Sequence, residues 1–211
     1  MQINVPVIFD IQTMYVEDMT EHHQLSETMA GLVRFGALVA SANSTLLAAT
    51  AIAAAATLTP SAPILIDPNF GRTINVTGSA AGTVTINGRD YLNQPMSQLV
   101  TLATNTVLTT KAFKYVDNIV SGTFVGNVSL GPGTKVGFPF VVSEILYETA
   151  DGVAAGDPTL TAPVATTPSA TTGDIRGTAA PATTMNATAV ISMVVAFNPL
   201  ATGGLYGQKQ A

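Results

Sequence analysis

From residue 63 onwards, the sequence alternates short runs of strand-forming residues with residues that favour turns. The runs recur at regular spacing and are bounded by Gly, Pro, Asn or Asp, a pattern typical of an all-β sandwich or barrel. The expected strands are 64–66, 73–77, 83–87, 97–102, 112–120, 123–130 and 136–147. Residues 63–149 therefore predict an antiparallel β-sandwich or barrel of jelly-roll-like type.

We expect residues 3–11 to form an extended N-terminal arm, because every second residue in this segment is apolar. A period of two predicts a strand with one apolar face. Pro6 lacks the backbone N–H that a central strand needs, so we expect an edge strand or an arm that crosses to another subunit. The apolar face consists of Ile3, Val5, Val7, Phe9 and Ile11.

The next segment, residues 15–29, holds four acidic residues and no Lys or Arg. Ser26 is placed to cap a short helix there. This helix would turn Met29, Leu32 and Val33 inward, although two nearby glycines disfavour it.

Residues 46–58 are rich in alanine and are consistent with a helix or with a strand that faces small residues. The strand is favoured because the following prolines break a helix and because the rest of the chain reads as β. The segment is shorter than the about 20 residues that span a bilayer. The first ten residues lack the basic region of a secretory signal. We expect no membrane partner.

A stretch rich in Pro, Thr, Ala and Gly covers residues 150–184 and predicts a long loop or an arm on a neighbour, because it cannot bury enough apolar area alone. Residues 188–197 predict a last strand that pairs back into the main domain. The expected division is an N-terminal arm and acidic segment, 1–45, followed by a β-sandwich domain, 46–211, with 150–184 as an excursion.

The composition excludes several classes of function. Only 10% of the residues are charged, the net charge is −5 and the 8 basic residues are scattered, which argues against binding nucleic acid. The absence of cysteine from the sequence excludes disulfides, thiolate metal sites and cysteine nucleophiles.

Candidate catalytic groups are few. His22 and His23 are adjacent and would rarely bind one metal, so a solvated loop or a pH-sensitive contact between subunits is expected. Glu144 and Glu148 are expected about 13 Å apart on one face of their strand. The two catalytic carboxyl groups of a glycosidase lie only about 5–9.5 Å apart, so these residues do not form such a pair. The sequence GPGTK at 131–135 lacks the spacing of a phosphate loop and predicts a turn. We expect no enzymatic activity, cofactor or metal site.

Two short motifs place opposite charges close together in this charge-poor chain. They are Gly88-Arg89-Asp90 and Asp174-Ile175-Arg176-Gly177. Either motif could pin a turn or reach a neighbouring subunit, although surface pairs contribute little stability by themselves.

Five runs in the middle of the chain resemble a pattern in small virion proteins of tailed bacteriophages. They are GRTINVT at 71–77, TVTINGRD at 83–90, NQPMS at 93–97, KAFKYVD at 111–117 and GTKVGFP at 133–139. GDIRGT at 173–178 and LYG at 205–207 resemble the ends of such proteins. Two positions depart from the pattern: Asn93 stands where glycine is common, and Gln98 where an acid is common.

The resemblance implies a capsid decoration, or cement, protein on the virion surface. Its partners would be the major capsid protein and further copies of itself, with trimers at local threefold axes as a natural geometry. The alternative is a tail, head–tail connector or fibre-base component. A carbohydrate-binding or adhesin module is a third class, which the absence of Trp from the sequence disfavours. The expected contact residues are Ile3, Val5, Val7 and Phe9 in the arm, and Asp174 and Arg176 in the loop.

Overall fold

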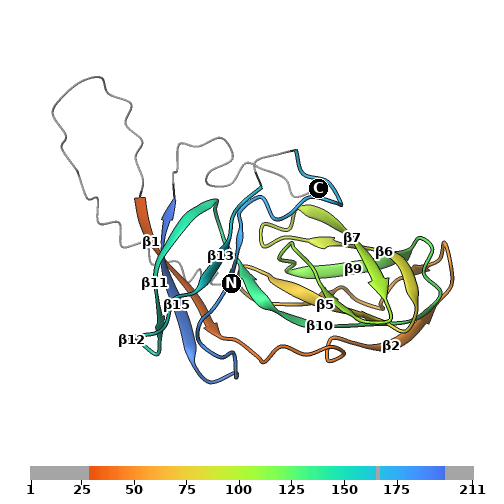
Figure 1. Cartoon of the computed structure of the whole chain (residues 1–211), viewed down its shortest axis with the longest axis horizontal. Helices are drawn as coiled ribbons and strands as arrows, with labels where there is room; N and C mark the ends of the chain where they lie inside the picture. Colours follow the sequence, from red (N-terminus) through yellow and green to blue (C-terminus); the bar gives the residue numbers. More distant parts are fainter. Residues whose placement is uncertain (1–28, 165–166, 198–211) are drawn as a thin grey trace, which may run out of the picture.

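The computed structural model describes residues 29–164 and 167–197, and within these ranges the chain consists of strands and turns, with no helix. All pairings between the described strands are antiparallel. The strands form two lobes that lie side by side (Figure 1). The prediction of an all-β antiparallel sandwich or barrel is confirmed. Among the described residues, no helix is present that could cross a membrane.

The larger lobe is a sandwich of two sheets, and the end of the second sheet formed by β13 (Thr159–Thr161) and β14 (Thr178–Ala180) packs against the core of the smaller lobe. The first contains β3 (Thr57–Leu58), β9 (Tyr115–Ser121), β6 (Ala81–Arg89) and β7 (Pro95–Ala103) in this order, with β4 (Ile64–Leu65) also paired to β9. The second contains β13, β14, β10 (Gly126–Gly137), β5 (Arg72–Gly78) and β8 (Thr106–Leu108) in this order, with β2 (Leu47–Ile52) paired to β10.

Alternating burial along the strands builds the core of this lobe. In β7, Met96, Val100 and Leu102 point inward, while Leu99 between them faces outward. Burying a side chain of this size contributes about 1.5–3 kcal/mol. The fully buried members from other elements are Ile74, Val76, Val84, Ile86, Phe113, Val116, Ile119, Phe124, Val128 and Leu130.

The smaller lobe is a four-stranded sheet at one end of the molecule (Figure 1). Its order is β1 (Met29–Ala37), β15 (Val190–Phe197), β11 (Val142–Ala150) and β12 (Val153–Ala154). Its inner face packs into a second core that depends on aromatic side chains. The rings of Phe140 and Phe197 stack with centroids 4.1 Å apart, and Phe35 meets Phe138 edge-on at 5.8 Å. These large side chains compensate for the many small residues of the chain.

β10 connects the two cores. Val128 lies in the larger core and Val136 in the smaller one. The turn expected at 131–135 is wrong, because these residues lie inside β10, where the register shifts between Pro132 and Val136. A Cβ atom at Gly131 would collide with the carbonyl oxygen of Ala42. Glycine is therefore needed here for a close backbone approach.

The helix expected near Ser26, with Met29, Leu32 and Val33 inward, is also wrong where the structure describes it. Residues 29–37 form β1, which pairs with β15 along its length. Val33 is buried and Leu32 exposed, as alternation in a strand requires. β1 therefore ties residues on the N-terminal side of the expected boundary at 45 into a sheet with the last strand.

Three further expectations are refined. The strand interpretation of 46–58 is confirmed, but a turn at 53–56 divides the segment into β2 and β3. The single strand expected at 136–147 is wrong, because β10 ends at Gly137 and β11 begins at Val142. The stretch 150–184 contains three short strands, β12, β13 and β14, so it is partly built into the sheets.

Candidate functional site

The two charged motifs from the sequence meet inside the molecule. Asp90 directly follows β6 and Arg176 precedes β14, and Nη2 of Arg176 lies 2.8 Å from Oδ2 of Asp90. The two side chains are 1% and 5% exposed, so the pair is shielded from solvent. The two atoms lack the alignment of a hydrogen bond, and the attraction is ionic. The Arg176 guanidinium also lies 5.1 Å from the ring centroid of Tyr91.

Asp90 also shapes the turn between β6 and β7. Its Oδ1 accepts a hydrogen bond from the backbone N–H of Gln94 at 2.8 Å, and its carbonyl oxygen accepts one from Asn93 at 3.0 Å. Asn93 has φ +65°, in the left-handed region that favours Gly or Asn. This conformation gives a physical reason for glycine or asparagine at this position.

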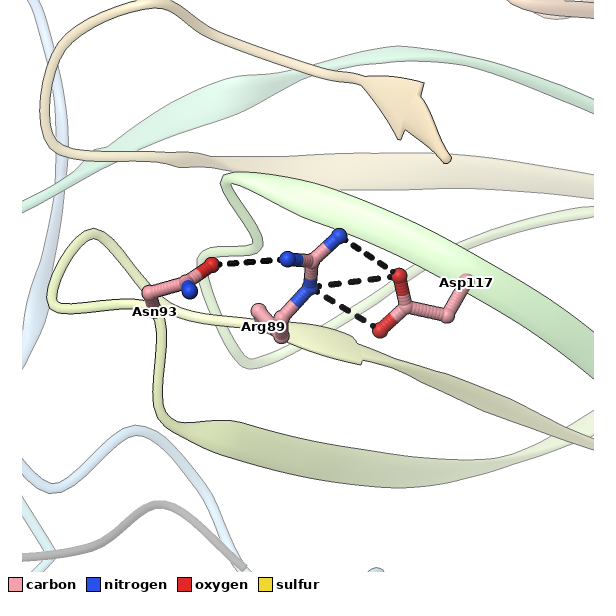
Figure 2. Close-up of polar contacts among 3 residues, drawn as sticks. All are labelled: Arg89, Asn93 and Asp117. Atoms are coloured by element: carbon pink, nitrogen blue, oxygen red, sulfur yellow. Dashed lines mark hydrogen bonds and ion pairs between the residues drawn. The ribbon is translucent and has the colours of Figure 1, made fainter. Parts of the chain in front are cut away.

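Arg89, the last residue of β6, lies between Asn93 of the same turn and Asp117 of β9 (Figure 2). Its Nη2 and Nε contact the carboxylate of Asp117, with the shortest distance 2.8 Å, and Nη1 donates to Oδ1 of Asn93 at 2.8 Å. The guanidinium carbon lies 4.9 Å from the ring centroid of Tyr115. The side chains of Arg89 and Asp117 are about a third exposed, 28% and 34%, so water weakens this pair.

Lys111 and Asp174 form a second buried charged pair beside the first. Lys111 is fully buried, and its Nζ donates to the carbonyl oxygen of Ser169 at 2.8 Å. The carboxylate of Asp174 accepts backbone N–H groups from Ala112 and Arg176, each at 2.9 Å. Burial lowers the pKa of Lys111, and the negative charge of Asp174 opposes this shift.

We call Asp90, Lys111, Asp174 and Arg176 the ionic junction. It fastens residues 169–176 to the larger lobe, helped by a hydrogen bond from Leu99 N to Ala170 O at 2.7 Å. The carbonyl oxygen of Arg176 accepts the N–H of Val142 at 3.1 Å, at the start of β11. Arg176 therefore contacts both lobes, its side chain one and its backbone the other.

A separate buried arginine lies near Asp67. Arg72 is 1% exposed, and its Nη1 donates to the carbonyl oxygen of Val39 at 2.7 Å. Burial lowers its pKa to about 10, and the charge of Asp67 opposes the shift. Burial raises the pKa of Asp67, whereas the hydrogen bond from the backbone N–H of Asn69 and the positive charge of Arg72 act to lower it. Within the described residues, Nε and Nη2 of Arg72 have no hydrogen-bond partner.

Only some of the site residues predicted from the sequence lie in the part of the chain that the structure describes. Ile3, Val5, Val7, Phe9, His22 and His23 lie outside the described residues. Asp174 and Arg176, expected to contact a neighbour, are buried within the chain, where they pin a loop. In the described ranges, no cluster of three or more potential metal ligands is present.

Glu144 and Glu148 were expected on one face of a strand, and this is wrong. A register shift between Ile145 and Tyr147 turns Glu144 outward and Glu148 inward. Glu148 is 1% exposed, and its carboxylate accepts the backbone N–H groups of Ala182 and Thr183 at 2.9 and 2.8 Å. Sequence reasoning missed this role, as it missed the burial of Lys111 and Arg72, because nothing local distinguishes these residues from surface charges.

No protein-family model, curated protein or solved structure matches the chain.

Proposed function

We propose that this protein is a structural component of a tailed-phage virion that decorates the capsid shell and stabilises it by binding between major capsid protein subunits. The observation that carries the proposal is the burial of charge. Within the described residues, seven charged side chains are buried, so an already charge-poor surface becomes poorer still. The buried charged residues are Asp67, Arg72, Asp90, Lys111, Glu148, Asp174 and Arg176.

Such a surface favours another protein as the partner. Recognition of nucleic acid depends on Lys and Arg that reach phosphates, and three of the seven basic residues that the structure describes are buried. What remains outside is largely uncharged, with exposed apolar side chains and strand edges that suit contact with neighbouring subunits.

The residues behind the family resemblance also support the proposal. They fall on β5, β6, the turn at 90–94, the start of β7, β9 and the end of β10. β5, β6, β7 and β9 belong to the larger lobe, and the end of β10 reaches the core of the smaller lobe, so the resembling runs gather in the larger lobe and at its junction with the smaller one. A protein of this kind stabilises a shell by mass action, because it binds the assembled lattice better than free subunits.

Shell binding is the direct test. Shells that lack the protein are mixed with the purified chain and pelleted, and the bound copies are counted at rising salt concentration. We expect many copies per shell, binding that depends weakly on salt, and higher resistance of the shell to heat. The absence of shell binding or unchanged heat resistance contradicts the proposal. A copy number that corresponds to one ring per virion favours a connector or tail component.

The N-terminal arm is tested in the same assay. We propose that Ile3, Val5, Val7 and Phe9 contribute to the contact, and a chain that lacks residues 1–12 is expected to bind shells more weakly than the full chain. Equal binding by the two chains removes the arm from the contact.

A further inference from the structure

The outer face of the smaller lobe is unusually apolar for a solvent-facing sheet. Positions from β1, β15 and β11 lie side by side in three cross-strand rows, as the pairing registers show. The rows are Ala30–Ala196–Glu144, Leu32–Val194–Tyr147 and Arg34–Ser192–Thr149. An antiparallel sheet with one face in water normally places polar residues on that face. The middle row of this face instead consists of large hydrophobic side chains, with the Tyr147 hydroxyl as its one polar group.

The middle row is open to solvent at both ends. Leu32 is 36% exposed and Tyr147 is 51% exposed, with Val194 between them half-buried. Contiguous apolar surface of this kind marks a contact site more often than an isolated exposed side chain does. A partner surface that is flat and apolar at its centre would therefore fit this face.

The charges on this face complement each other across its centre. Arg34 ends one outer row on β1, and Glu144 ends the opposite outer row on β11, so the two lie at diagonal corners around Val194. Both side chains are exposed. In the described part of the chain, neither forms an ion pair.

We infer that this face binds the same face of a second copy, with Val194 near a twofold axis. A twofold axis perpendicular to the Arg34–Glu144 diagonal and parallel to the sheets places Arg34 of each copy against Glu144 of the other. Such an isologous contact forms both ion pairs at once. The two sheets then cross at a steep angle, as in orthogonal sheet packing. The middle row of each copy is covered by the middle row of the other.

A second copy fits better than an unrelated partner because the face carries its own complement, one positive and one negative corner about an apolar centre. The contact does not rest on the shell-binding proposal, and it is a twofold contact, not the trimer that the sequence analysis named. The two proposals can therefore fail separately.

Charge reversal tests the contact in the full chain by sedimentation equilibrium. We expect a dimer for the wild type. Each of the variants Arg34→Glu and Glu144→Arg should weaken association by at least about tenfold, because a like-charge contact then occurs twice per dimer. The double variant should restore wild-type affinity, since the pairs re-form with reversed sign. Asp157→Lys, an exposed charge outside the three rows, is the control and should leave association unchanged.

A variant at the centre of the face provides an independent check. Leu32→Lys adds a charge to an exposed side chain, so the fold should persist by circular dichroism while the dimer is lost. A monomeric or trimeric wild type overturns the inference, as does a dimer that tolerates both single reversals. Failure of the double variant to recover affinity overturns the Arg34–Glu144 pairing.

Discussion

Arg176 and Asp90, far apart in the sequence, form a buried ion pair with 2.8 Å between Nη2 and Oδ2. Each residue also has a second structural role. Asp90 closes the turn between β6 and β7 through Gln94, and the backbone of Arg176 bonds to Val142 at the start of β11. The pair therefore joins a hairpin of the larger lobe to the first residue of a strand in the smaller lobe.

Removing one member of this pair should be strongly destabilising. Asp90→Asn leaves the Arg176 charge buried without a counter-charge, and we expect a loss of about 3–5 kcal/mol in the free energy of unfolding, measured by urea denaturation. Adding Arg176→Met should recover part of that loss, because no unpaired charge then remains. Arg89→Met breaks the partly exposed pair with Asp117 and should cost no more than about 1 kcal/mol. Equal losses for Asp90→Asn and Arg89→Met would contradict this account.

Lys111 should make stability depend on pH in the alkaline range. Its pKa is lowered in the folded state from the ordinary value of 10.5. Between the lowered pKa and 10.5, the unfolded chain binds more protons than the folded chain, so this residue makes stability rise with pH. The difference in urea midpoint between wild type and Lys111→Met should therefore shift in favour of the wild type as pH rises through that window. Lys114→Met is the control, and a similar shift in it would refute the assignment to Lys111.

Glu148 should be far more important for stability than its place in the sequence indicates. Glu148→Ala leaves the N–H groups of Ala182 and Thr183 without their acceptors, and we expect a loss of about 2–3 kcal/mol in thermal or urea unfolding. Glu148→Gln keeps one acceptor oxygen and should lose less. The exposed Asp157→Ala should stay within about 0.5 kcal/mol of the wild type. A loss for Glu148→Ala as small as that of Asp157→Ala would show that these hydrogen bonds contribute little.

The left-handed conformation of Asn93 can be tested with two substitutions that both remove its hydrogen bond to Arg89. Asn93→Ala should be less stable than Asn93→Gly by about 1–2 kcal/mol, because alanine at φ +65° brings its Cβ atom too close to a backbone oxygen. The comparison cancels the lost side-chain contact and measures the backbone term alone. Equal stability of the two variants would mean that the turn relaxes to another conformation.

Several features of the fold are predictable from local pattern. The strands at 73–77, 83–87 and 97–102 all lie within observed strands, because one buried face per strand produces an alternation that is visible in the sequence. The errors occur where partners are distant. Gly131 indicates a turn locally, but the structure uses it to let β10 pass the backbone of Ala42. The helix expected to turn Met29, Leu32 and Val33 inward is, from residue 29 on, the strand β1, whose pairing partner is the last strand.

The sequence by itself determined that the chain is all-β, poor in charge and free of cysteine, because these properties follow from composition and from periodicities within a few residues. Only the tertiary structure decided what its few charges do. Two motifs that looked like surface turns supply the two halves of a buried ion pair, Glu144 and Glu148 point to opposite faces through a bulge, and Arg34 and Glu144 lie at opposite corners of one sheet face. Burial and partnership depend on contacts between segments far apart in the chain, and no local pattern in one sequence records them.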